Sequence, residues 1–351
     1  MSYQTPPSHP SLEELARRQQ NVITASQLRA RGVPTRLVSE HCRRGGPWQR
    51  VLPRVYLLQD GEPTPEQRMW AALLYAAQNG REEGRREGAV ITGAAALALY
   101  GFASAPRLPA VTEVDVLVPR QRRLRDVGEV RIRRTERELE ARSVHGLACA
   151  PVARAVADAV REWTDEGVFD RGEARPELLR DVLREAVSPT PATPGLVSGE
   201  FRCTLRELVA ELQESDLLGE ARVRAALDEL LAVERESVLD RIGELVDEWL
   251  LPVPLAGPEL RMRGGTYIAV PDLYWPAVAV AVEVDSELRC VSEGESAWVR
   301  GGQHRMEYLG VRVVYVSGER VLREPDAVGA ELREAFVAGG VDVVELLVIE
   351  R

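Results

Sequence analysis

The sequence of 351 residues predicts a multidomain α/β protein: a winged helix-turn-helix, then an α+β and helical middle, then a mixed sheet flanked by helices. Two observations predict this class. Short helices and strands alternate at the N-terminus, and strands alternate with helices again near the C-terminus. A stretch with three prolines and no charge, residues 188–199, is the best candidate for a linker. We therefore expect four segments, namely residues 1–60, 61–165, 166–236 and 237–351.

The first segment carries the signals of three short helices and a hairpin. Ser11 followed by Glu14 is typical of a capping box, and Thr24 is placed to cap a second helix. A third helix begins at Pro34 and is broken by consecutive glycines. Two short strands follow around Pro53. Three helices and a hairpin within so few residues predict a winged helix-turn-helix, whose third helix can enter a major groove.

Charge is distributed unevenly along the chain. Residues 1–60 carry nine arginines against four acids, a net charge of +5, whereas the whole chain carries −10. A basic head on an acidic body indicates a polyanionic partner, here double-stranded DNA. On the third helix we expect Leu37 and Val38 to face the core. The candidate DNA-binding residues surround that helix and the hairpin: Arg36, Arg43, Arg44, Arg50 and Arg54. The alternative is a solvated face on a purely structural module.

Several classes of chemistry are excluded or disfavoured by composition. All 45 basic residues are arginine, so lysine-dependent catalysis is excluded. The four cysteines and four histidines are scattered without paired spacing, which disfavours a zinc cluster or a disulfide framework. The polar, proline-rich N-terminus is unlike a signal peptide, and the uncharged residues 88–106 are typical of a buried helix rather than a membrane span. We expect a cytoplasmic protein with no membrane association.

The most legible pattern for a reactive site runs from residue 278 to residue 285. Valines alternate with small residues and then with acids, so one face is apolar and the other ends in carboxylates. A fold-back at Pro276 is expected to place Asp272 opposite roughly residue 281. Asp272, Glu283 and Asp285 then converge, and a divalent cation such as Mg²⁺ relieves their repulsion and can activate water on a phosphodiester. The alternative is that these acids end a strand and face solvent.

The segment PDLYWPAVAVAVEVDS resembles the core of the restriction-endonuclease-like PD-(D/E)xK superfamily, especially the branch related to very-short-patch-repair endonucleases. The resemblance implies a Mg²⁺-dependent DNA endonuclease domain, a hydrolase, in residues 237–351. Its metal ligands and catalytic acids are then Asp272, Glu283 and Asp285. The segment QHRMEYLGVRVVYV is similar to the final helix and strand of that branch, which implies auxiliary polar roles for Gln303 and His304. The position of the lysine usual in the superfamily is occupied by Asp285, and the short-patch-repair branch also lacks this lysine.

A second resemblance covers roughly the first 160 residues. NVITASQLRARGV, RGGPWQRVLPRVYLL and PVARAVAD are similar to the winged-helix region of abortive-infection antitoxins of the AbiEi type. This likeness implies the alternative function: a non-catalytic transcriptional regulator, or a type IV toxin–antitoxin antitoxin, with a degenerate nuclease fold. A cognate toxin or another protein would then be a partner, and the acidic middle would suit that interface. The sequence leaves both functions open.

Overall fold

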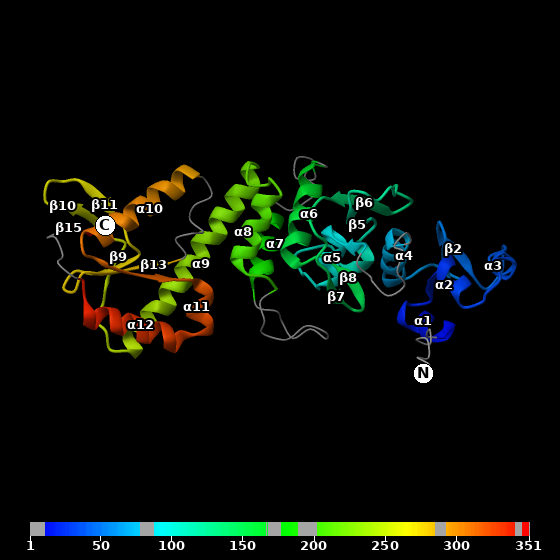
Figure 1. Cartoon of the computed structure of the whole chain (residues 1–351), viewed down its shortest axis with the longest axis horizontal. Helices are drawn as coiled ribbons and strands as arrows, with labels where there is room; N and C mark the ends of the chain where they lie inside the picture. The colour runs from blue at the N-terminus through cyan, green and yellow to red at the C-terminus, as the bar shows by residue number, and fades with distance from the viewer. Residues whose placement is uncertain are drawn as a thin grey trace, which may run out of the picture. The chain divides into compact units, whose positions relative to one another are not determined.

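The computed structural model describes residues 11–77, 88–165, 167, 177–188, 202–284, 293–340 and 346–350, with the backbone alone for residues 293–300 (Figure 1). Contacts divide the chain into two compact units, residues 1–217 and 218–351, each described by itself. Both units combine helices with sheets, so the chain is a mixed α/β protein of more than one unit. Within the described ranges, every helix is too short or too polar to traverse a lipid bilayer.

The first unit begins with a small head, residues 11–58. Its elements are α1 Leu12–Arg18, β1 Val22–Thr24, α2 Ala25–Ala30, α3 Thr35–His41, β2 Gln49–Leu52 and β3 Val55–Leu57. The strands form an antiparallel sheet in the order β1-β3-β2. Both predicted helix starts are confirmed, because the Ser11 hydroxyl accepts a hydrogen bond from the Glu14 N–H and Thr24 forms a complete capping box with Gln27. Strand β1 has no counterpart in the sequence prediction.

One apolar cluster holds the head together. Ile23 and Leu28 are fully buried and pack with Val38 of α3, while Trp48 covers the cluster from the start of the hairpin. The predicted inward orientation of Val38 is confirmed. The same prediction for Leu37 is wrong, since its exposed fraction is 37%. Successive helical residues lie about 100° apart, so a helix of two turns buries only one of two neighbours.

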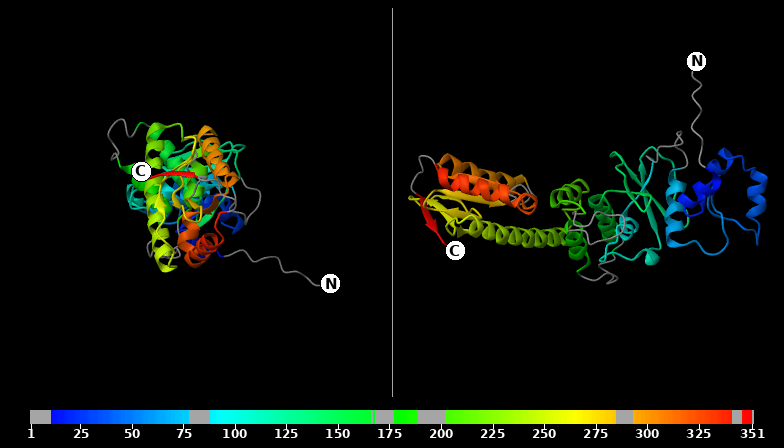
Figure 2. Two further views of the ribbon diagram at one scale, coloured as in Figure 1. Left: turned by 90° about the vertical axis from the view of Figure 1, so that its left-hand side faces the viewer. Right: turned by 90° about the horizontal axis from the view of Figure 1, so that it is seen from below.

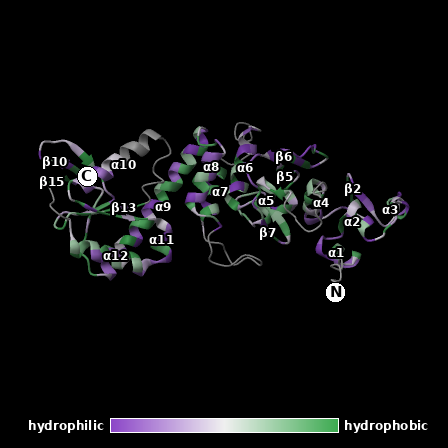
Figure 3. Ribbon diagram, viewed as in Figure 1, coloured by the Kyte–Doolittle hydropathy of each residue, from purple (hydrophilic) through white to green (hydrophobic). Residues whose placement is uncertain are grey.

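The rest of the first unit is a five-stranded sheet covered by helices. Its elements are α4 Pro65–Ala77, β4 Val90–Ile91, α5 Gly93–Leu99, a 3-10 turn at Leu108–Ala110, β5 Val114–Pro119, β6 Val130–Thr135, β7 Arg142–Val144, β8 Leu147–Cys149, α6 Val152–Asp165, α7 Leu178–Val187 and α8 Leu205–Glu214. The strand order is β6-β5-β4-β8-β7. Helix α4 contacts strands of the head and of this sheet, which joins the two parts. Helices α7 and α8 show both hydrophobic and hydrophilic bands (Figure 3), as expected for helices that bury one face.

The second unit opens with one long helix and continues as two sheets. Its elements are α9 Ala221–Glu248, β9 Leu255–Ala256, β10 Glu259–Met262, β11 Tyr267–Ala269, β12 Leu273–Trp275, β13 Val280–Val284, α10 Glu293–Tyr308, β14 Arg312–Val316, α11 Gly318–Arg323, α12 Pro325–Ala338 and β15 Leu346–Ile349. The sheets have the orders β14-β13-β12-β9 and β11-β10-β15. Helix α9 is unbroken over 28 residues (Figure 2). The boundary expected after residue 236 therefore lies inside this helix, whereas contacts divide the chain after Leu217.

The alternation predicted for β13 is confirmed on both faces of the sheet. Val280, Val282 and Val284 pack in a core shared with helices α9, α11 and α12. Ala281 belongs to a second core on the opposite face, together with Met306 of α10. The strand is buried on both sides, which explains why its sequence is apolar at every position before the acids.

One expectation for this region is corrected by the strand pairing. Residues 267–269 and 273–275 form strands in different sheets, and Pro271 between them has no N–H to continue a ladder. Leu273 pairs with Val282, so Asp272 lies opposite Glu283 instead of residue 281. The turn before β13 is longer than a fold-back at Pro276 requires. Of the predicted linker 188–199, only Ser188 lies within the described residues.

Candidate nucleic-acid interface and carboxylate site

Five arginines form an exposed cationic surface on the head, which we call the arginine surface: Arg36, Arg43, Arg44, Arg50 and Arg54. All five are exposed. In the part of the chain that the structure describes, none of their guanidinium groups forms a hydrogen bond or an ion pair. Their positive charge is therefore directed to solvent rather than neutralised within the fold. Several arginines elsewhere in the first unit are ion-paired, for example Arg131 with Glu113.

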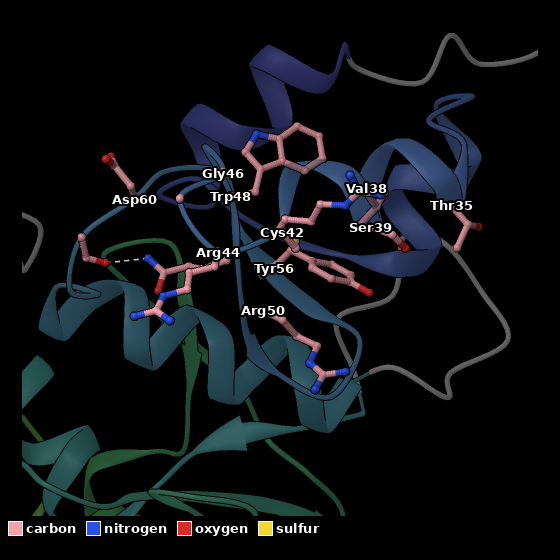
Figure 4. A pocket seen from close by; sticks show the side chains of 14 residues that line it. Thr35, Val38, Ser39, Cys42, Arg44, Gly46, Trp48, Arg50, Tyr56 and Asp60 are labelled. Carbon is pink, nitrogen blue, oxygen red and sulfur yellow. Dashed lines mark hydrogen bonds between the residues drawn. The ribbon is translucent and has the colours of Figure 1, made fainter.

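A groove of about 690 Å³ lies between α3 and the hairpin of β2 and β3 (Figure 4). Arg43, Arg44 and Arg50 contribute to its wall, and Tyr56 lies on the strand behind them. Asp60 is an acid on the same lining. Three arginines against one acid line the groove, so it is concave and positively charged.

Trp48 anchors this groove rather than lining it as a free stacking platform. Its ring meets the His41 ring edge-on, with 4.5 Å between centroids and an interplanar angle of 89°. The indole also packs against the core of the head. Together these contacts fix the end of α3 against the start of β2.

Arg54 occupies the tip of the hairpin in a left-handed backbone conformation, with φ of +62°. This conformation is strained for a large residue. The Ala25 N–H donates a 2.8 Å hydrogen bond to the Arg54 carbonyl and holds the turn in place. The backbone of Arg54 is thus held in place at the tip of the hairpin, in a strained conformation.

In the second unit, two of the three predicted carboxylates are adjacent. Asp272 precedes β12 and Glu283 lies in β13, and the Asp272 N–H donates to the Val282 carbonyl at 3.0 Å. The exposed fractions of Asp272 and Glu283 are 1% and 3%, so the alternative in which they simply face solvent does not hold for either. Asp285 lies outside the described residues.

The carboxylate of Asp272 is already engaged by the protein. Its Oδ1 accepts hydrogen bonds from Nε of Arg235, at 2.7 Å, and from Nη2 of the same guanidinium. Its Oδ2 accepts from the Val284 N–H, also at 2.7 Å. Arg235 comes from α9, and the sequence analysis did not single it out.

The nuclease resemblance implies a Mg²⁺ ion at this site. The contacts of the Asp272 carboxylate test whether the residues present could bind it. Mg²⁺ requires oxygen ligands at about 2.0–2.1 Å in near-octahedral geometry. Both oxygens of Asp272 are committed to nitrogen donors, one of them a permanent cation. No three His, Cys, Asp or Glu side chains among the described residues are grouped as a metal site. The described donor set therefore does not fit Mg²⁺.

Gln303 and His304 lie on α10, which packs against β14 and β11. Nε2 of Gln303 is buried without a hydrogen-bond partner among the described residues, whereas His304 is exposed. Tyr315 of β14 is the register partner of Glu283, and its hydroxyl donates a 3.0 Å hydrogen bond to Glu307 of α10. Burial and these carboxylates raise the pKa of Tyr315, so its proton stays on the phenol. Tyr315 and Glu307 are neighbours of the site that the sequence analysis missed.

A separate cluster of buried polar groups ties α6 to the sheet of the first unit. The Thr92 hydroxyl donates to Oδ2 of Asp158 at 2.6 Å, and Nε of Arg154 donates to the same oxygen at 3.0 Å. Arg133 pairs with Asp115 on the neighbouring strand at 2.6 Å. Burial raises the pKa of Asp158 to about 6, and it also raises the pKa of Asp115. These contacts are internal and structural.

Comparison with known proteins shows a remote structural likeness. No protein-family model matches the chain, and no curated protein matches it. Among solved structures, the chain is similar to the crystal structure of the RV2827C protein from Mycobacterium tuberculosis, with 17% sequence identity and a TM-score of 0.38. The match covers 62% of this chain and 75% of that chain. A likeness at this TM-score shows no shared function.

Proposed function

We propose that this protein binds double-stranded DNA through its N-terminal head, as a non-catalytic regulator of the kind implied by the antitoxin resemblance. The observation that carries the proposal is the arginine surface: five exposed arginines without an internal partner among the described residues, on the one basic segment of an acidic chain. Exposed arginines that a protein does not neutralise itself are typical of phosphate contacts.

The order of elements supports the same proposal. In a winged helix-turn-helix, α2 and α3 form the helix pair, α3 enters the major groove, and the hairpin β2–β3 is the wing. Arg36 then lies on the recognition helix, where a base contact is made, whereas Arg50 and Arg54 lie on the wing. The groove between α3 and the wing would receive one strand of the sugar–phosphate backbone.

The competing function is Mg²⁺-dependent hydrolysis of phosphodiesters by the second unit. It requires Asp272, Glu283 and Asp285 to share a cation. The ion pair between Arg235 and Asp272 weighs against it, because the carboxylate would have to release the guanidinium first. For this reason we favour the regulator, with the second unit as a scaffold that contacts a cognate toxin or another protein.

Selection from a random duplex library in the presence of EDTA tests the proposal. We expect the full-length protein to enrich one sequence motif without any metal, and Arg36→Gln to weaken or broaden one position of that motif. Arg54→Gln should lower affinity for all sequences about equally. Arg323→Gln, a matched loss of one exposed arginine in the second unit, should change neither property.

Two results would contradict this function. Failure to retain any duplex in EDTA would remove the DNA-binding role. Cleavage of the selected duplexes after Mg²⁺ is added, abolished by Glu283→Gln, would instead establish the competing hydrolase.

A further inference from the structure

Helix α9 carries the arginine, Arg235, that pairs with the buried carboxylate of Asp272. Val238, Ile242 and Leu245 hold this helix against the valine face of β13. Arg235 lies one turn before this apolar contact, so packing of the helix fixes where its side chain begins. The guanidinium then reaches Oδ1 of Asp272 across 37 residues of sequence.

The environment of Asp272 makes a cation necessary there. The side chain of Asp272 is completely buried, while that of Arg235 is 43% exposed. A buried carboxylate is stable as an anion only if it is paired or strongly hydrogen-bonded. Glu283 is buried directly across the strand pair, which adds a second acid to the same place. The Val284 amide is a neutral donor, whereas the Arg235 guanidinium supplies a full compensating charge.

We infer that Arg235 is the built-in counter-cation of the Asp272 site, and that its guanidinium takes the place of the divalent metal that the nuclease resemblance implies. The guanidinium cannot lose its proton in a protein, so its charge is present under all ordinary conditions. A divalent cation would have to displace this donor and then lie beside it, where like charges repel. The folded unit is therefore indifferent to Mg²⁺, and removal of the guanidinium exposes a latent cation site made from Asp272 and its acidic neighbour.

Thermal unfolding of the full-length protein, with EDTA or with millimolar Mg²⁺, tests this inference. We expect the unfolding midpoint of the wild type to be the same in both buffers. Arg235→Gln should lower the midpoint in EDTA. With Mg²⁺ at about 100 times its Kd, the midpoint of this variant should then rise by about 5 °C, as expected for a cation that binds only the folded state.

Two further variants separate a charge effect from a general loss of contacts. Arg241→Gln removes another arginine of α9 that is ion-paired with two acids, Glu244 and Glu248, on the helix surface. It should show no response to Mg²⁺, because exposed acids bind the ion too weakly. The double variant Arg235→Gln with Asp272→Asn removes both charges. It should recover stability in EDTA and lose the response to Mg²⁺.

Each remaining outcome decides against the inference. Calorimetric binding of one Mn²⁺ to the wild type, abolished by Asp272→Asn, would show that the guanidinium does not hold the position. An Arg235→Gln variant that folds with an unchanged midpoint and no Mg²⁺ response would show the same. If Arg235→Gln alone does not fold in EDTA, the inference requires that the double variant Arg235→Gln with Asp272→Asn does fold. Failure of both would mean that Arg235 acts through contacts other than the charge of Asp272.

Discussion

The proposed DNA binding predicts a salt dependence that can be calculated from the arginine surface. If each of the five guanidinium groups neutralises one phosphate, the logarithm of the binding constant falls with the logarithm of salt concentration with a slope of about −4.5, that is 0.9 × 5. Between about 50 and 200 mM salt, this slope corresponds to a loss of affinity of about 500-fold. None of this loss depends on a metal ion.

The double variant Arg43→Gln with Arg44→Gln removes two of these contacts from the wall of the groove. The slope should then become about −2.7, and the loss over the same salt range about 40-fold. The fold should be unaffected, since both side chains are exposed and form no hydrogen bond or ion pair with the described residues. Fluorescence anisotropy of a labelled duplex, titrated at several salt concentrations in EDTA, measures both slopes.

The matched control removes the same charge elsewhere. Arg323→Gln with Arg333→Gln takes two exposed arginines from the second unit. This control should keep the wild-type slope of about −4.5. The reasoning is refuted if the Arg43 and Arg44 variant keeps the wild-type slope, or if the control variant lowers it equally, because net charge rather than the arginine surface would then govern binding.

Two further predictions concern stability. Because burial raises the pKa of Asp158 to about 6, the folded state keeps a proton that the unfolded chain releases near pH 4. Raising the pH from about 4 to about 6 should therefore lower the free energy of unfolding by up to about 3 kcal/mol. Urea unfolding should show this pH dependence reduced in Asp158→Asn; an equal dependence in both proteins would contradict the assignment. In the second unit, a Cβ at Gly329 would lie 2.1 Å from Nε1 of Trp249. Gly329→Ala should therefore lower the free energy of unfolding, measured by chemical denaturation, by about 1–3 kcal/mol. Gly243→Ala, at an exposed position near the C-terminal end of α9 with nothing within 4 Å, should instead raise the free energy of unfolding by up to about 1 kcal/mol. The same sign for both variants would refute the packing argument.

The features that the sequence predicted correctly act over a few residues. Thr24 caps α2 through the residue three places ahead, and Val38 faces the core because of its place in a short helical pattern. The two faces of β13 follow from a period of two. The exposure of the arginine surface follows from the same local patterns, since its members lie outside the apolar positions.

The carboxylate site was predicted less completely, because its decisive contacts are long-range. The adjacency of Asp272 and Glu283 was expected, but the register was displaced by two residues because the turn between the strands is longer. The pairing of Asp272 with Arg235 carries no local signal, since Arg235 looks like any exposed residue of an amphipathic helix. The sheet that joins β10 to β15 likewise pairs residues that lie far apart in the chain. Only tertiary packing decides such partners.

The left-handed turn at Arg54 has a consequence for the course of mutation at that position. Glycine adopts a φ of +62° without strain, so stability alone favours glycine there by about 1 kcal/mol. Stability and the proposed DNA contact therefore favour different residues at position 54. In a saturation library sorted for heat resistance, glycine should accumulate at residue 54. In the same library sorted for DNA retention, arginine should persist. The difference between the two enrichments would measure how much stability is lost at residue 54 for the proposed contact with DNA.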